Sequence, residues 1–331
     1  MSKLILHVGT HKTGTTSTQD TLALNRSLLE RNGVIYPEIG KANGQHGLVT
    51  EWIDLPKPLH LQTTAVEAWK MLGREHGKSD RTVLISSEEL SRSSPNMRVD
   101  MAHLRVLCSA FDEVRVVCFL RNQATYMQSL YLEIVKGGRN IPWHPIFTSA
   151  IQRHSAVGMY LDYKDLRQFF ETGFSANEIR FFSYEQACKE KHGVIGRILV
   201  EAGHEALIPS LQRLPNGFRN VSPDPLMTWV ASRIVGDKTL KPWLVEAGRN
   251  ALTESLGREA KTTIFSNHEY GVVEKVYTER NLEFERAEQA IGYPVQIGPF
   301  FNSDETFFRN ELNNDFWIRL AQNLYGRSHN A

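Results

Sequence analysis

The segment GTHKTGTTS, residues 9–17, gathers residue types that bind anions. Its glycines let the chain turn tightly and bring backbone N–H groups toward a ligand. A strand pattern precedes it at Leu4–Val8 and a helical pattern follows, so the positive N-terminal end of that helix would face the same anion. Thr15, Thr16 and Ser17 add hydroxyl donors. These features predict a loop that cradles a terminal phosphate. The simpler alternative is a Gly- and Thr-rich turn after an edge strand.

The loop departs from the ATP-type sequence G-x-x-x-x-G-K-[ST] at one position. Gly9 and Gly14 have the required spacing and Thr16 fits the last position, but Thr15 stands where that sequence has lysine. The lysine is Lys12 instead, and no apolar strand pattern ends in an aspartate suited to magnesium. A nucleoside triphosphate needs Mg²⁺ to neutralise its charges, whereas a sulfuryl group on one phosphate carries less charge. The sequence therefore predicts a donor handled by lysine, hydroxyls and amides, without a metal.

The segment HVGTHKTGTTSTQ resembles the 5′-phosphosulfate loop of the sulfotransferases that use 3′-phosphoadenosine-5′-phosphosulfate (PAPS), especially the bacterial glycan-type and heparan-sulfate-modifying enzymes. The resemblance implies that Lys12 contacts the bridging oxygen and the sulfuryl group. It also implies that His11 shapes the loop or donates to the sulfuryl group. The donor-binding residues implied in this loop are His11, Lys12, Thr13, Gly14, Thr15, Thr16 and Ser17.

A second pair of candidate residues lies eight positions apart. Arg121 directly follows the apolar run Val114–Leu120, so it would stand at the carboxyl end of a buried strand and could bind a phosphate with two hydrogen bonds. Ser129 lies two turns into the following helical pattern. The pair resembles the 3′-phosphate site of the same family, although many members have Asp-Pro where this chain has Asn122 and Gln123.

The resemblance continues in two later segments. YLDYKDLRQFFETGFSANEIRFFSYEQ resembles the family's tyrosine-led helix and the strand after it, and RNVSPDPL resembles its late nucleotide-contacting segment. In the second segment the matching residues are Arg219, Asn220 and Ser222.

Sulfuryl transfer needs a base to take the acceptor's proton. Glu88 and Glu89 follow the strand pattern TVLIS, and a carboxylate there would enter the same crevice as the loop. Glu88 is the closer match to the family's catalytic glutamate, with Glu89 one residue away. His46, in a glycine-flanked loop, is the rival base. A helix-capping role for Glu88 is the structural alternative.

The resemblance implies transfer from PAPS to a hydroxyl or amine of an acceptor, with adenosine-3′,5′-bisphosphate (PAP) as product. A carbohydrate acceptor is favoured by the resemblance alone. Two other functions stay open at this point: an ATP-dependent small-molecule kinase with an atypical loop, and a catalytically silent nucleotide-binding module.

These residues require a sheet that brings strand ends together. Short β-branched or aromatic runs at Leu4–Val8, Val83–Ile85, Val114–Leu120 and Ile179–Phe182 alternate with helical patterns, which include Thr15–Arg31. The alternation predicts a three-layer α/β/α fold with a central parallel sheet, like that of P-loop nucleotide hydrolases. We expect a single domain over residues 1–331, with a core of about 1–225 and a helical extension of about 226–331.

Composition narrows the setting of the protein. The 331 residues carry 38 Lys and Arg against 37 Asp and Glu, so no global basic field indicates nucleic acid or an anionic membrane as partner. The three cysteines lie far apart without CxxC spacing, and the histidines form no HExxH cluster, so we expect neither disulfides nor a metal site. No run is apolar enough for a signal peptide or a membrane span. These features predict a cytoplasmic protein.

Overall fold

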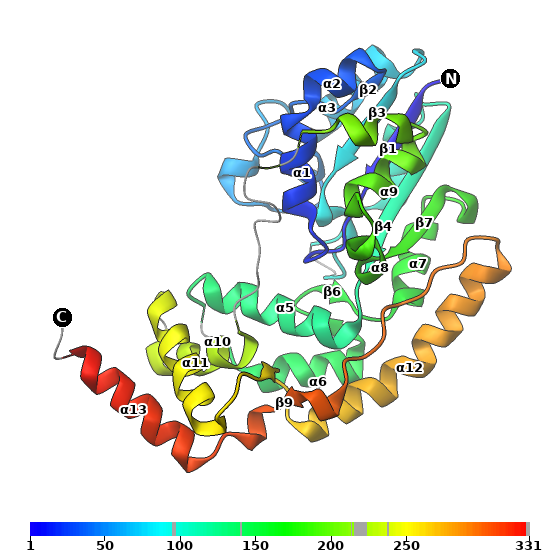
Figure 1. Ribbon diagram of the computed structural model, residues 1–331. Coiled ribbons are helices and arrows are strands. Elements are labelled where there is room, and N and C mark those ends of the chain that lie inside the picture. The colour runs from blue at the N-terminus through cyan, green and yellow to red at the C-terminus, as the bar shows by residue number, and fades with distance from the viewer. Residues whose placement is uncertain (95–96, 140, 213, 215–223, 237, 329–331) are drawn as a thin grey trace. The chain divides into compact units, whose positions relative to one another are not determined.

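The computed structural model describes residues 1–331 except 95–96, 140, 213, 215–223, 237 and 329–331 (Figure 1). The chain divides into two compact units that alternate along the sequence. Unit 1 comprises Met1–Asn122, Val157–Arg219 and Glu279–Gly298, and unit 2 comprises the remainder. The expected single domain over 1–331 stays a prediction.

A five-stranded sheet forms the centre of unit 1 (Figure 1). Its strands are β1 (Lys3–His7), β2 (Val34–Ile35), β3 (Thr82–Ser86), β4 (Glu113–Leu120) and β7 (Ile179–Ser183). Their order is β2-β3-β1-β4-β7, and every pairing is parallel. The central strand β1 therefore has β3 on one side and β4 on the other, a position where parallel α/β sheets bind ligands beyond the strands' carboxyl ends.

Both faces of this sheet are buried, which explains the nearly continuous apolar runs in the sequence. Leu4 and Leu6 of β1 belong to one apolar cluster, whereas the intervening Ile5 belongs to a second cluster on the opposite face. Helices cover both faces. They are α1 (Thr15–Leu24), α2 (Arg26–Arg31), α3 (Ala65–His76), α4 (Met101–Leu107), α7 (Tyr163–Glu171), α8 (Tyr184–Lys189) and α9 (Gly193–Ala202).

The predicted fold class, a three-layer α/β arrangement with a central parallel sheet and a helical C-terminal part, is confirmed. All four predicted strands are present within one residue of their expected ends. The predicted helix over Thr15–Arg31 is in fact two helices, because the chain breaks at Asn25 between α1 and α2.

Unit 2 is mainly helical and has its own apolar cluster, which includes Leu226, Leu252 and Phe316. Its helices are α5 (Gln123–Lys136), α6 (Trp143–Arg153), α10 (Pro225–Val235), α11 (Pro242–Leu256), α12 (Asn267–Ala290) and α13 (Asn314–Ser328). The second half of α12 belongs to unit 1. A short parallel pair, β8 (Lys261–Thr262) with β9 (Thr306–Phe307), was not expected from the sequence. The remaining short strands are β5 (Ser155–Ala156) and β6 (Met159–Tyr160).

Candidate active site

The loop that follows β1 is bonded to the neighbouring strand β4. The Thr10 N–H donates to the carbonyl of Phe119 at 2.9 Å, and the Val8 N–H donates to that of Val117 at 3.0 Å. Gly9 and Gly14 have φ values of 88° and 76°, which a residue with a side chain rarely adopts. Gly14 leads directly into α1, whose first turn presents N–H groups without intrahelical partners. The loop therefore turns at both glycines and leads into the start of α1, and its role in binding a phosphate stays a prediction.

The hydroxyl residues of the loop differ in their surroundings. Thr16 is exposed and Ser17 is half-buried, so both hydroxyls can reach a ligand. The Thr13 hydroxyl instead donates to the carbonyl of Thr10 at 2.5 Å, and Thr13 is fully buried. Thr13 thus holds the loop's own shape in this structure.

Two cationic residues meet at the loop. Lys12 has φ 60°, and its carbonyl accepts a hydrogen bond from Nη1 of Arg121 at 3.0 Å. The Arg121 guanidinium also lies 5.4 Å from the centre of the Tyr184 ring, and its Nε is 4.0 Å from Oε1 of Glu185. The structure thus brings the ends of β1, β4 and β7 together at Arg121.

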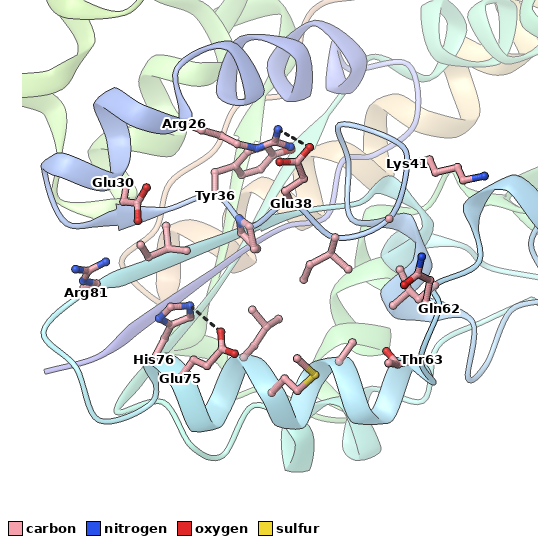
Figure 2. Close-up of a pocket in the computed structure, with 18 of the residues that line it drawn as sticks. Arg26, Glu30, Tyr36, Glu38, Lys41, Gln62, Thr63, Glu75, His76 and Arg81 are labelled. Carbon is pink, nitrogen blue, oxygen red and sulfur yellow. Dashed lines mark ion pairs between the residues drawn. The ribbon is translucent and has the colours of Figure 1, made fainter.

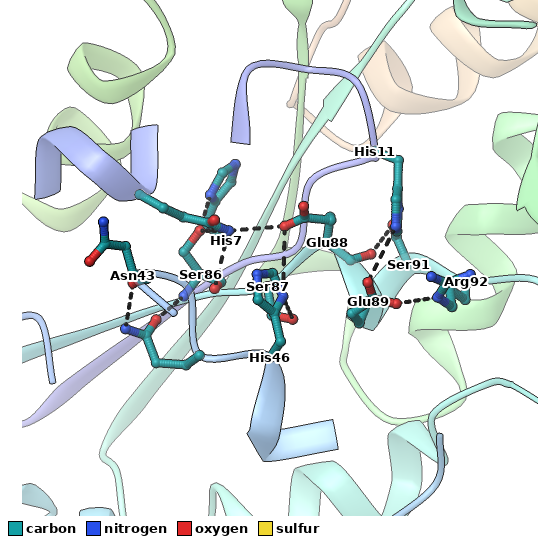
Figure 3. A network of polar contacts seen from close by, with 12 residues as sticks. His7, His11, Asn43, His46, Ser86, Ser87, Glu88, Glu89, Ser91 and Arg92 are labelled. Carbon is teal, nitrogen blue, oxygen red and sulfur yellow. Dashed lines mark hydrogen bonds and ion pairs between the residues drawn. The ribbon is translucent and has the colours of Figure 1, made fainter. Parts of the chain in front are cut away.

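Glu88 stands at the end of β3, against the loop. A Cβ added to Gly9 would lie 2.9 Å from the Glu88 Cβ, so the absence of a side chain at Gly9 is what allows this approach. Oε2 of Glu88 accepts a hydrogen bond from Nε2 of Gln19 at 2.9 Å and lies 3.9 Å from Nδ1 of His46 (Figure 3). The backbone N–H of Glu88 also donates a hydrogen bond to its own carboxylate. Within the described ranges, the side chains of Gln19 and His46 both approach the carboxylate at Oε2.

The surroundings of Glu88 keep it ionised. Burial opposes ionisation, but the charges of His46 and His11 and the hydrogen bond from Gln19 outweigh it and lower the pKa of Glu88. His46 also has a hydrogen-bonding partner of its own, since its Nδ1 lies 3.0 Å from the hydroxyl of Ser87.

Glu89 has both carboxylate oxygens in use. Oε1 lies 3.5 Å from Nε2 of His11, and Oε2 forms an ion pair with Arg92 (Figure 3). Burial opposes its ionisation, but the bonds from His11 and Arg92 prevail and lower the pKa of Glu89 to about 2. Glu89 therefore joins the loop histidine to the segment after β3.

A buried histidine that the sequence analysis missed lies behind these carboxylates. His7 ends β1 and is fully buried, with Nδ1 2.8 Å from the Ser86 hydroxyl. Burial lowers the pKa of His7 to about 4, and the charge of Glu88 offsets this only in part. A polar residue in the otherwise apolar strand LILHV was the signal that could have singled it out.

The structure does not test the expected 3′-phosphate partners of Arg121. Ser129 lies in α5 of unit 2 and is buried there, whereas Arg121 belongs to unit 1, so their pairing stays a prediction. Arg219, Asn220 and Ser222 lie outside the described residues.

A hollow of about 220 Å³ lies beside the loop in unit 1. Gly14, Ser17 and Thr21 form its loop and α1 side, and Tyr184 and Cys188 of α8 face them. The rest of its lining includes the apolar side chains of Val194, Ile195, Ile208 and Leu211 and the polar ones of Lys191, His192 and Gln212. The hollow is open to the same loop that would hold a terminal phosphate.

A larger cleft of about 780 Å³ lies along the edge strand β2 (Figure 2). Arg26 and Glu38, which both line it, form an ion pair at 3.5 Å, whereas Lys41 and Arg81 are exposed on its rim. Tyr36 lines it and donates through its hydroxyl to the carbonyl of Asn43 at 2.6 Å. The segment after β2 therefore has this cleft on one side and the Glu88 network on the other.

The described part of the chain contains no group of three potential metal ligands among its His, Cys, Asp and Glu side chains. None of the helices within the described ranges is long and apolar enough to cross a bilayer.

No model of a known protein family matches the sequence, and no curated protein matches it. Among solved structures, the chain is similar to a crystal structure of a sulfotransferase from Alicyclobacillus acidocaldarius, with 14% sequence identity and a TM-score of 0.42. The alignment covers 77% of this chain and 96% of that chain.

Proposed function

We propose that this chain is a sulfotransferase that transfers the sulfuryl group of PAPS to a hydroxyl or amine of an acceptor. The convergence of Lys12, Arg121 and Glu88 at one edge of the sheet supports this function best. Two cations and the positive end of α1 suit a donor with two phosphates, and an ionised carboxylate beside them suits the acceptor's proton. The Thr at position 15, where an ATP-type loop has lysine, argues against a kinase.

The donor would bind in two parts. The first-turn N–H groups of α1, the hydroxyls of Thr16 and Ser17 and the Lys12 ammonium would hold the phosphosulfate, and the adjoining hollow has apolar walls suited to a nucleoside. Arg121, with Ser129 and Arg219 as proposed partners, would hold the 3′-phosphate.

In the reaction, the acceptor's oxygen or nitrogen attacks sulfur and the bond between sulfur and the bridging oxygen breaks. The acceptor's proton passes to Glu88, and PAP leaves with the electron pair on the former bridging oxygen. Lys12 would stabilise the negative charge that grows there, because a fixed cation is most effective where charge develops.

Glu88 suits the role of base better than Glu89. Gln19 and His46 both approach Glu88 at Oε2, whereas His11 and Arg92 engage both oxygens of Glu89. A proton acceptor must approach the reacting group directly, so an engaged carboxylate would first have to break an ion pair.

The acceptor side is proposed as a carbohydrate or another hydroxyl compound. The cleft beside β2 is the candidate for the part of the acceptor that does not react. Tyr36, which lines the cleft, donates a hydrogen bond to the carbonyl of Asn43, and Asn43 lies in the segment that leads to His46. Charge reversal at Lys41 and Arg81 should then raise the KM for the acceptor and leave PAP affinity unchanged.

The deciding experiment compares thermal stabilisation by PAP in EDTA with that by ATP and Mg²⁺. We expect PAP to raise Tm without metal, since a ligand that binds the native state stabilises it in proportion to its saturation. Greater stabilisation by ATP and Mg²⁺ would indicate a kinase instead. Binding of PAP without transfer of labelled sulfate from PAPS to any sugar or alcohol would indicate a silent nucleotide-binding module.

A further inference from the structure

Gln19 is a buried amide that the reaction described above does not use. It lies in the second turn of α1 and is 4% exposed. Its Nε2 is 2.9 Å from Oε2 of Glu88 and 3.2 Å from the hydroxyl of Ser86. The side chain therefore connects the helix after the anion loop to the strand end that carries the candidate base.

The chemistry of its neighbours fixes which way this amide points. An ionised carboxylate accepts hydrogen bonds and donates none, so the group nearest to Glu88 must be the NH₂ of Gln19. The second N–H of that group can donate to the Ser86 hydroxyl, which also lies 2.8 Å from Nδ1 of His7. Burial keeps His7 neutral, so the cluster behind Glu88 carries no second charge at this point.

Packing holds the amide in place from the opposite side. A Cβ added to Gly44 would lie 2.6 Å from Cδ of Gln19, so the backbone at Gly44 lies directly against the carboxamide. The next residue, Gln45, accepts from the Ser86 N–H at 2.8 Å through its side-chain oxygen. Gln19 thus contacts Ser86 at the end of β3, Glu88 after it and the loop at Gly44.

We propose that Gln19 is a positioning residue for Glu88. By holding Oε2, Gln19 leaves Oε1 as the atom that accepts the acceptor's proton. The catalytic role of Glu88 rests on the proposed sulfotransferase function. The hold of Gln19 on Glu88 rests on the geometry alone, so the two can be tested separately.

Gln19 itself does not titrate, but several titratable groups also act on Glu88. His11 approaches from the loop and His46 from the turn after β2, and both favour its ionised form. The charge of Glu88 acts in turn on His7 and Tyr36. A test must therefore change Gln19 and leave these four side chains in place.

The primary test measures the titration of Glu88 by NMR in protein labelled with ¹³C at the glutamate carboxyl carbons, with Glu88→Gln to assign the signal. Gln19→Met removes the hydrogen bond at similar length, so the pKa of Glu88 should rise above its wild-type value. Gln19→Glu keeps the shape but adds a second carboxyl, so the pair should titrate as a unit with one pKa raised further. Gln186→Met, the same replacement at an exposed glutamine, should leave the titration unchanged.

Gly44→Ala provides a second route to the same group. The added methyl group would displace the Gln19 carboxamide, so it should also raise the pKa of Glu88. This variant decides the question if Gln19→Met does not fold. An unchanged Glu88 titration in a folded Gln19→Met or Gly44→Ala protein would overturn the proposal.

The kinetic consequence is tested with a sugar or alcohol to which the wild-type protein transfers labelled sulfate from PAPS. Gln19→Met should lower kcat by on the order of 10²-fold, as expected when a catalytic group is misplaced by about 1 Å. The acid limb of its pH profile should move upward together with the Glu88 titration, while PAP affinity stays unchanged. A lower kcat with an unmoved acid limb would show a merely structural role. A wild-type protein that binds no PAP would refute the proposed function, and the NMR titration would still decide the role of Gln19.

Discussion

At the scale of single residues, the site combines side chains that sequence patterns reveal with others that they do not. Lys12, Arg121 and Glu88 could be predicted because each follows a recognisable strand pattern, and parallel strands end at the same edge. Gln19 could not, because its importance comes from a contact with a residue 69 positions away. His7 was missed although it is polar in an otherwise apolar strand. From the sequence, Glu88 and Glu89 were almost equally good candidates for the catalytic base. The ion pairs of Glu89 with His11 and Arg92 now favour Glu88 for this role.

Replacing Lys12 should affect the rate more than binding. Negative charge grows on the bridging oxygen as its bond to sulfur breaks, so a cation there stabilises the transition state more than the bound donor. We expect Lys12→Ala to lower kcat on the order of 10²–10³-fold, by analogy with the loss of an oxyanion-hole donor. Steady-state kinetics with labelled PAPS measure it. An effect confined to KM would contradict the assigned role.

Replacing Glu88 should strongly lower turnover and leave donor binding unchanged. Glu88→Gln keeps the shape of the side chain but loses its basicity, so kcat should fall on the order of 10²–10⁴-fold while PAP affinity is retained. Glu89→Gln and His46→Ala are the matched controls, and both should be milder. If either control is inactive and Glu88→Gln is active, another group serves as base.

At the scale of elements, the strands were predictable and the helix boundaries less so. Strand positions followed from β-branched runs, which the sheet buries on both faces. The break between α1 and α2 was missed, because the Asn25 side chain forms two hydrogen bonds with the backbone of Gln212, at 3.0 and 2.8 Å. No local pattern announces a partner 187 residues away.

The closeness of the loop to β3 can be tested at Gly9. Gly9→Ala forces a side chain onto a backbone with φ 88° and places its Cβ 2.9 Å from that of Glu88. Gly203→Ala is the matched control, because Gly203 has φ 80° with no heavy atom within 4 Å of the added Cβ. Urea unfolding should show a loss of about 1–2 kcal/mol for Gly203→Ala from backbone strain alone. For Gly9→Ala we expect a further loss of about 1–3 kcal/mol from overpacking. Equal losses would mean that the loop yields without disturbing Glu88.

At the scale of the whole molecule, the expected helical C-terminal part is present, but the sequence did not show how the two units share the chain. The stretch Glu279–Gly298 belongs to unit 1, because Phe284 and Ile297 join the apolar cluster on one face of its sheet. Glu288 of this stretch also pairs with the buried Arg167. Such nonlocal pairings leave no mark in local periodicity.

The stability of the protein should depend on pH through His7. The pKa of His7 is about 4 in the folded state, whereas that of an exposed histidine is 6.5. Between these values the unfolded chain therefore binds a proton that the folded chain does not. The contribution of His7 to the free energy of unfolding is therefore fully present above pH 6.5 and falls as the pH decreases toward 4, by on the order of 3 kcal/mol. Unfolding free energies at several pH values, compared with His7→Gln, should show a shallower slope in the variant. Parallel slopes would mean that His7 is not kept neutral by burial.

The hollow beside the anion loop carries a thiol on its wall, and this gives the protein an internal reporter. Cys108 and Cys118 are buried, and burial raises the pKa of both thiols, to about 12 for Cys108, so neither should react in the native state. Cys188 is exposed and lines the hollow. A maleimide should therefore label one position in the folded chain. Its rate should fall as PAP fills the hollow, so mass spectrometry of the labelled protein would measure donor affinity without any acceptor.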